Sequence, residues 1–417
     1  MKTRGVGLLI IKNCNLINMA GIYEEIMDIR IENGKIVEID ANIDADKYQD
    51  AQIIDAENNF VTPGIVEPHS EIGVREQIYR FEGNDANEGT DPILPQLRAI
   101  DAINPTDEGI KVARESGVTT VVAGTGDSNL IGGTFVAFKT YGNTIEEMVI
   151  EDEIAFKVSL GNTPKEVYGN KDMMPKTRMA SAAMIREAFI KAKEYHRQYN
   201  SENPPKFDMK MHSLMRIYDG MLVKFTAHQA YDIVTAIRLG EEFNLNYTVD
   251  KCSEAYLIAD ELKEFNTKFV IGPAYGGKRD HEIRNRDTII ASVMEKEGLN
   301  FCISTGHPTV DISMTMVQTI MMHKKGLSRK MALEAMTINA ANMVGLGDRI
   351  GSIEVGKDAD IVIWDGEPLD YYTSAKVVII DGKTQGDVGK HRGTVLLCYY
   401  VGKCDTRRRK KYERISN

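Results

Sequence analysis

Short apolar runs alternate with amphipathic stretches through the middle of this chain, from residue 63 to about residue 349. The runs have the length of strands, and the stretches between them have the length and periodicity of helices. This alternation predicts βα units around a parallel sheet. The expected strands cover residues 118–123, 154–160, 222–226, 246–250, 268–271 and 300–304. The segment is long enough for an α/β fold of the (β/α)8 type, a TIM-like barrel whose chemistry lies at the carboxyl ends of its strands.

Both ends of the chain are also rich in short strands. We expect strands at residues 8–11, 28–32, 35–39 and 52–55 near the start, and at 359–364 and 376–380 near the end. Asn33-Gly34 is a strong signal for a two-residue hairpin turn. We therefore expect a composite β-sandwich built from residues 1–62 and 350–384, with the barrel at 63–349 between its two parts. We expect residues 385–417 to be a C-terminal extension with a strand at 395–400, and the sequence there includes a basic tail at 407–411.

The composition restricts the partners of the chain. The formal net charge of −10 argues against a nucleic-acid binder, which needs a basic face. No apolar run approaches the ~18 residues of a membrane span. The five cysteines are widely spaced without a C-x-x-C motif, which is typical of a reducing compartment. We expect a cytoplasmic protein that acts on a small-molecule substrate or ligand, with no nucleic acid and no membrane as partner.

The segment from Phe60 to Glu71 differs at one position from a metal-binding sequence motif. An apolar run, Thr-Pro-Gly and then His-x-His would bring two imidazoles to a divalent metal at the end of a first barrel strand, and here the second position is Glu71. A carboxylate is still a ligand, although a harder donor than imidazole. The candidate metal ligands are His69, Glu71 and His228, for a divalent metal such as Zn if this remnant site binds one.

Six further segments form a recognisable set of motifs: 61–69, Gly132-Gly133-Thr134, 161–169, Thr305-Gly306-His307-Pro308, 337–341 and 351–362. Together they resemble the amidohydrolase superfamily, and in particular the imidazolonepropionase-like amidohydrolases. The resemblance implies a metal-dependent barrel that hydrolyses C–N bonds in amides, cyclic amides or dipeptides. It also implies one or two metals held by His-x-His after strand one, Lys or Glu after strand four, His after strands five and six, and Asp after strand eight.

The chain departs from this pattern at most ligand positions. Besides Glu71, the departures are Asn162 for the acid after strand four, Thr226 for the first His after strand five, Lys251 for the His after strand six and Gly306 for the final Asp. The loss at Gly306 removes a ligand and the general base together. Lys157 is a candidate carboxylated lysine, although we favour a role in the barrel wall. Gly132-Gly133-Thr134 is a weak candidate for a phosphate loop.

Three functions stay open at this point. The first is a hydrolase with a remodelled site, which uses either one metal on His69, Glu71 and His228 or acid–base chemistry by Glu71 and Lys251. The second is a pseudoenzyme or small-molecule binder in which a Glu71–Lys251 ion pair replaces the metal. The third is a lyase or isomerase that uses Lys251 as a Schiff-base or proton-transfer residue. In each case Thr226, His228 and His307 are candidate ligand-binding residues, and a homo-oligomer is left open.

Overall fold

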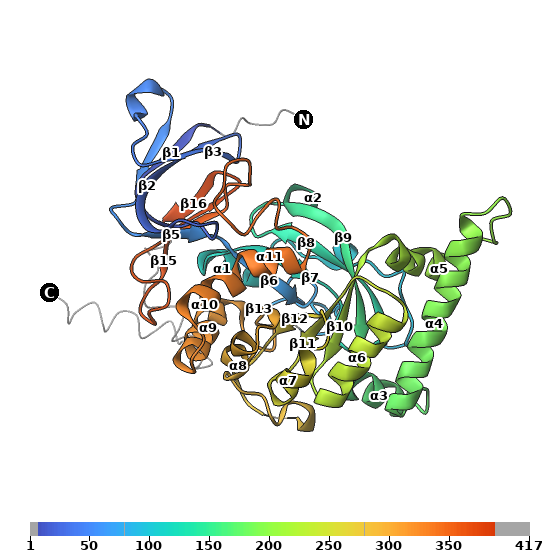
Figure 1. The fold of residues 1–417 in the computed structure, drawn as a ribbon. Helices are drawn as coiled ribbons and strands as arrows, with labels where there is room; N and C mark the ends of the chain where they lie inside the picture. Colours follow the sequence, from blue (N-terminus) through green and yellow to red (C-terminus); the bar gives the residue numbers. More distant parts are fainter. Residues whose placement is uncertain (1–6, 79, 279, 388–417) are drawn as a thin grey trace, which may run out of the picture.

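The structure of this chain is a computed structural model that describes residues 7–78, 80–278 and 280–387 (Figure 1). Its strands form two sheets of eight strands each. One sheet curls into the barrel in the middle of the chain, and the other joins the two ends of the chain beside it. Within the described residues, no helix is both long and apolar enough to cross a membrane.

The middle of the chain folds as a TIM-like barrel in which the strands pair in sequence order. All six strands expected here are present, each within a few residues of its expected bounds except β9, which begins earlier. The barrel strands are β6 (Ile65–Ser70), β7 (Val118–Ala123), β8 (Ile131–Lys139), β9 (Val149–Ser159), β10 (Leu222–Ala227), β11 (Tyr247–Lys251), β12 (Lys268–Ile271) and β13 (Asn300–Ile303). The strand ends of β6 and β13 meet where the Glu71 backbone N–H donates to the His307 carbonyl over 2.8 Å.

Strand β8 departs from the (β/α)8 pattern, because it runs antiparallel to both β7 and β9. This strand was not predicted from the sequence, and the interpretation of Gly132-Gly133-Thr134 as a weak candidate for a phosphate loop is wrong. These three residues lie inside β8 and are buried. Gly133 has φ +99°, and a Cβ there would lie 2.4 Å from the Leu97 carbonyl oxygen. The glycine therefore permits a close approach of two backbones.

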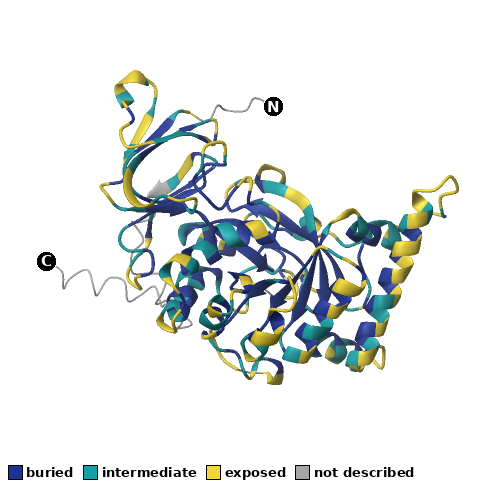
Figure 2. Ribbon diagram, in the orientation of Figure 1, coloured by how far each residue is buried: buried dark blue, intermediate teal, exposed yellow. Residues whose placement is uncertain are grey.

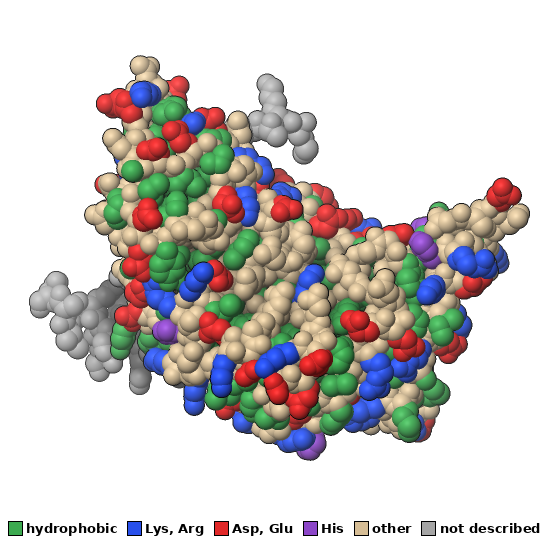
Figure 3. Space-filling view, in the orientation of Figure 1, with side chains coloured by type: hydrophobic (Ala, Val, Ile, Leu, Met, Phe, Trp, Pro, Cys, Tyr) green, Lys and Arg blue, Asp and Glu red, His purple; other side chains and the backbone are tan. Residues whose placement is uncertain are grey.

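Helices surround the barrel and leave their outer faces exposed, while the strands are almost entirely buried (Figure 2). The long helix α4 begins after Thr177, whose side chain accepts a hydrogen bond from the Ala180 N–H and so caps its first turn. The helices are α1 (Glu108–Glu115), α2 (Ile145–Met148), α3 (Asn162–Gly169), α4 (Arg178–Tyr199), α5 (Met209–Leu214), α6 (Ala230–Glu242), α7 (Ala259–Leu262), α8 (Ile290–Lys296), α9 (Thr315–Lys324), α10 (Arg329–Met336) and α11 (Ile338–Met343). Acidic and basic side chains are intermixed on the face shown in Figure 3.

The second sheet is composite, since strands from both ends of the chain pair within it. Asn33 and Gly34 both have positive φ, 51° and 79°, as the predicted hairpin turn requires. A two-sheet sandwich stays a prediction, and the strand expected at 395–400 and the basic tail lie outside the described residues. The strands are β1 (Leu9–Ile17), β2 (Tyr23–Glu32), β3 (Lys35–Asp40), β4 (Gln52–Asp55), β5 (Phe60–Pro63), β14 (Ile361–Trp364), β15 (Ala375–Ile380) and β16 (Lys383–Asp387).

A buried ion-pair cluster joins the two sheets. Lys139, the last residue of β8, is 2% exposed and forms ion pairs with Asp358, Asp360 and Asp381 near the strands of the composite sheet. Burial alone would lower the pKa of Lys139, but the three carboxylates raise it. The ammonium is therefore held charged at the junction between the two parts of the fold.

Candidate functional site

The barrel interior carries several charged side chains, although the interior of such a barrel is usually filled by branched apolar side chains. Strand β6 places Glu67 and His69 there, β9 places Lys157, β10 places Lys224, and β11 places Asp250. All five residues are at most 4% exposed. Buried charges are costly unless each has a partner, so their contacts show how this arrangement is stabilised.

Glu67 ties the first barrel strand to the last. Its carboxylate accepts hydrogen bonds from Ser304 Oγ at 2.5 Å and from the Thr305 N–H and hydroxyl at 2.9 and 2.7 Å. Burial raises the pKa of Glu67, and these hydrogen bonds oppose the shift. The segment after β13 is thereby held against β6, which fixes the backbone that carries His69.

His69 is held by a carboxylate on the opposite side of the barrel. Its Nδ1 lies 2.5 Å from Asp250 Oδ2, and Lys224 Nζ lies 2.9 Å from the same oxygen. Burial and the nearby Lys157 charge lower the pKa of His69 to about 3, whereas Asp250 acts in the opposite direction. The imidazole is therefore neutral, with its hydrogen on Nδ1 towards Asp250 and its Nε2 lone pair free to accept.

Lys157 lies on the barrel strand β9, as the favoured interpretation of a role in the barrel wall requires, and its side chain also contacts three other residues of the candidate site. Its Nζ lies 3.1 Å from His69 Nε2, 2.6 Å from Thr226 Oγ1 and 2.7 Å from Asp127 Oδ1. Burial lowers the pKa of Lys157, and the charge on Asp127 opposes that shift. Two of these contacts, to His69 and Thr226, are hydrogen bonds, and the third is an ion pair with Asp127.

Asp127, from the loop between β7 and β8, bridges two lysines. One oxygen pairs with Lys157 and the other accepts a hydrogen bond from Lys251 Nζ. Burial alone would raise the pKa of Asp127, but the charges on Lys157 and Lys251 hold it well below its usual range. Burial likewise opposes the charge on Lys251, yet Asp127 and Glu71 raise its pKa. The ionised carboxylate thus favours the charged form of both lysines, although burial and the Lys251 charge lower the pKa of Lys157.

Glu71 and Lys251 do not form the direct ion pair expected from the sequence, and each of them pairs with another residue instead. Lys251 pairs with Asp127, while Glu71 Oε2 lies 3.1 Å from Nη2 of Arg75, one turn away. Glu71 still acts on Lys251 as a nearby negative charge. Burial raises the pKa of Glu71, and Arg75 and Lys251 oppose the shift. The partner of Lys251 is therefore Asp127, a residue that no sequence motif marked.

The candidate metal ligands do not fit a metal ion. His69 Nε2, which would have to face the metal, accepts from the Lys157 ammonium, and a second ammonium lies beside it on Lys251. His228 Nδ1 is 2.7 Å from Ser253 Oγ, and burial lowers the pKa of His228 to about 3. Among the described residues, no three His, Cys, Asp or Glu side chains are grouped so that they could hold a metal. A divalent cation here would also meet two positive charges.

The backbone conformation after the eighth barrel strand explains why position 306 is a glycine. Gly306 has φ +54°, in the left-handed region, and a Cβ there would lie 2.9 Å from Pro273 Cδ. An aspartate at this position would be strained and would displace the proline ring. The backbone conformation of this loop therefore disfavours a side chain at position 306.

The candidate ligand-binding residues lie at different places around the mouth of the barrel. Thr226 contacts Lys157, and His228 follows on the same side, after β10. His307 follows β13, where its Nδ1 accepts from the Ile312 N–H over 3.2 Å. Its Nε2 therefore carries the hydrogen, and this buried donor has no hydrogen-bond partner among the described residues. Burial lowers the pKa of His307 to about 4, so the ring is neutral.

Sequence reasoning missed four charged residues of the site, Asp127, Lys224, Asp250 and Glu282. Lys224 and Asp250 carried a usable signal, because each is a charged residue within an apolar strand. Glu282, in the short 3-10 helix η5 (His281–Ile283), lies over the end of β9, where its Oε1 accepts from the Asn162 N–H over 3.1 Å. Burial raises the pKa of Glu282 to about 7. Neither Glu282, in this short 3-10 helix, nor Asp127, in a loop, was marked by a local pattern.

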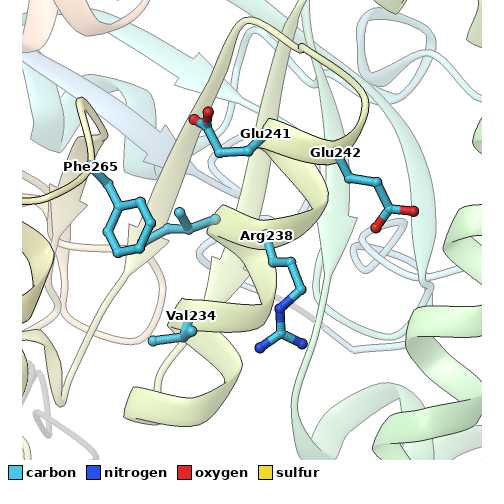
Figure 4. Close-up of a pocket in the computed structure, with 6 residues that line it drawn as sticks. Val234, Arg238, Glu241, Glu242 and Phe265 are labelled. Carbon is cyan, nitrogen blue, oxygen red and sulfur yellow. The ribbon is translucent and has the colours of Figure 1, made fainter.

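Two surface hollows lie away from this charged centre. One is on the outer face of α6 and is lined by Val234, Arg238, Glu241, Glu242 and Phe265 with Ile237 (Figure 4). The other lies at the amino ends of β10 and β12, where Leu222 and Lys268 begin these strands. Since the charged centre is at the carboxyl ends, neither hollow contains its residues.

The fold is that of a TIM-like barrel protein with a composite β-sheet beside the barrel. The model of the amidohydrolase family matches residues 60–386, and the chain belongs to this family. It is similar to the amidohydrolase tasK of Hapsidospora irregularis, 27% identical over 86% of this chain and 40% of that protein. It is also similar to the imidazolonepropionase of Geobacillus kaustophilus, 24% identical over 86% of this chain and 90% of the relative. A solved structure of an amidohydrolase from Thermotoga maritima matches 91% of this chain and 100% of its own, with 33% identity and a TM-score of 0.86.

Proposed function

We propose that this chain is a small-molecule-binding member of the amidohydrolase family whose barrel site works without a metal ion. The observation that carries the proposal is the contact of the Lys157 ammonium with His69 Nε2, Thr226 Oγ1 and Asp127 Oδ1. A covalently attached cation in this position supplies the charge that a metal would supply elsewhere. It cannot, however, activate a water molecule, because an ammonium has donors only.

The residues at the strand ends support a loss of metal-dependent hydrolysis rather than a change of metal. Lys251 adds a second ammonium on β11, and Gly306 leaves no carboxylate after β13 to accept a proton from an attacking water. Membership of the amidohydrolase family suggests an alternative function for this chain, the hydrolysis of C–N bonds. In this chain that chemistry would have to use Glu71 or Glu282 as the base, since both are buried at the barrel mouth and have raised pKa values.

The lysine-based alternative is less well supported at Lys251 than the sequence suggested. A Schiff base forms from a neutral amine, whereas Asp127 and Glu71 raise the pKa of Lys251. Burial lowers the pKa of Lys157, but its three acceptors favour the ammonium. Borohydride reduction in the presence of small aldehydes and ketones tests both residues, and we expect no lysine adduct by mass spectrometry.

The experiment that tests the proposal is a hydrolysis screen with amides, cyclic amides and dipeptides. Wild-type protein is assayed as purified, after chelator treatment, and with added Zn²⁺ or Mn²⁺. We expect no turnover that depends on metal. Metal-dependent turnover that a chelator removes and that is lost in His69→Asn would overturn the proposal. Metal-independent turnover lost in Glu71→Gln or Glu282→Gln would instead support the metal-free hydrolase.

A further inference from the structure

The two lysines of the site hold a carboxylate that belongs to the chain itself. Asp127 binds Lys157 through one oxygen and Lys251 through the other. We propose that the ligand of this site is a small molecule with a carboxylate group, which binds Lys251 and Lys157 in exchange for the side chain of Asp127. This inference rests on the proposed function, because a metal in the site would change which groups the lysines can contact.

Access to the site favours this exchange. The side chain of Asp127 is 19% exposed, that of Lys251 is 9% exposed and that of Lys157 is 1% exposed. A molecule that enters from solvent therefore meets Asp127 before it meets the lysines. Removing the Asp127 side chain from between them would leave two buried ammoniums, which is unfavourable unless another anion takes its place.

The backbone on either side of Asp127 is fixed, so the exchange needs only rotation of its side chain. The Gly126 N–H donates to the Ala86 carbonyl over 2.7 Å, and the Ser128 N–H donates to Asn87 Oδ1 over 3.0 Å. Rotation about side-chain bonds is fast and requires no opening of the loop. Asp127 thus acts as an internal competitor that is always present beside the lysines.

Charge and hydrogen-bond capacity both match a carboxylate ligand. Glu71, another carboxylate whose charge acts on Lys251, is already paired with Arg75. Two further buried donors at the carboxyl end of the barrel, His307 Nε2 and Arg286 Nε, have no hydrogen-bond partner among the described residues. Arg286 lies in the segment after β12, and its charge acts on His228. Oxygen acceptors of a ligand would satisfy such donors, whose burial without a partner is costly.

The test compares wild type with Asp127→Asn, which keeps the shape of the side chain and removes its charge. Acetate and formate are titrated by calorimetry at constant ionic strength, with acetamide as the neutral probe of the same shape. The apparent affinity for a ligand is lowered when an internal competitor leaves the site free in only a small fraction of the molecules, and removal of the competitor restores that affinity. We therefore expect Asp127→Asn to bind acetate at least about tenfold more tightly than wild type. Acetamide should bind neither protein, and Asp127→Asn with Lys251→Met should lose the gain.

Equal acetate affinity in wild type and Asp127→Asn, or none in either, would overturn the inference. If Asp127→Asn does not fold, Asp127→Ala is used, and acetate should raise its melting temperature more than that of wild type; no difference between them contradicts the proposal. Metal content is measured on the same samples. Acetate binding that appears only with bound metal refutes the metal-free function, whereas absent binding in metal-free, folded protein refutes only the carboxylate ligand.

Discussion

Lys157 donates a hydrogen bond from Nζ to Nε2 of His69 over 3.1 Å, so that an ammonium stands at the atom with which a metal-binding histidine would face its ion. This contact is one link in a chain of alternating partners that crosses the barrel. The chain runs through Lys224, Asp250, His69, Lys157, Asp127 and Lys251. Each charged group in it touches an opposite charge or an acceptor, which is the condition for stable burial.

Replacement of Lys157 by methionine should destabilise the fold strongly. The change removes the ammonium and leaves Asp127, His69 and Thr226 without their shared donor, which costs about 3–5 kcal/mol when a buried pair is broken. Denaturant unfolding measures the loss. The matched control is Lys193→Met on the exposed face of α4, which should change stability by no more than about 0.5 kcal/mol. If the two variants lose the same free energy, Lys157 is not a partner of the buried acceptors.

His69 should remain neutral across the physiological pH range. Burial and Lys157 lower its pKa to about 3, and Asp250 holds the hydrogen on Nδ1. Nitrogen-15 NMR of the histidine side chains should show the Nδ1–H tautomer for His69, with no titration between pH 5 and 8. The exposed His281 is an internal comparison for the same spectra. Protonation of His69 near pH 6.5, or the Nε2–H tautomer, is inconsistent with the contact to Lys157.

Glu282 should make the protein less stable as pH rises towards neutrality. Its pKa is raised to about 7 in the folded state, against ~4.3 in an unfolded chain. Between these values the folded state holds a proton that the unfolded state has released, so stability falls as pH increases and the loss is complete above about pH 7. Relative to Glu282→Gln, wild type should lose about 2–3 kcal/mol between pH 4.5 and 8. Parallel stability curves for the two proteins would show that Glu282 is ionised throughout.

Lys139 should stabilise the junction between the barrel and the composite sheet. Lys139→Met leaves Asp358 and Asp360 buried without their common cation, and we expect a cost of about 3–5 kcal/mol in thermal or denaturant unfolding. Asp381→Asn is the control, because Asp381 is 45% exposed and lies 3.6 Å from the ammonium. Its effect should stay below about 1 kcal/mol. Similar losses for both variants would mean that burial does not govern this cluster.

The barrel could be predicted well from the sequence, because the length of the apolar segments and their alternation with amphipathic segments are enough to identify buried parallel strands. Strand β8 was missed because its Gly-Gly start is typical of a loop, and its antiparallel direction depends on pairing with β7 and β9. The site was harder to predict. His69, Thr226, Lys251 and Gly306 follow strand ends and can be compared with a motif. Asp127 reaches the lysines from a loop, and its role depends on the closed barrel.

The central claim is that Lys157 and its acceptors replace a metal ion, and metal stoichiometry tests it most directly. The chain is expressed in medium supplemented with zinc and manganese, purified without chelator, desalted and measured by inductively coupled plasma mass spectrometry. The predicted result is a folded protein with far less than one equivalent of any transition metal per chain. About one equivalent of metal that is retained through desalting and lost in His69→Asn would contradict the account.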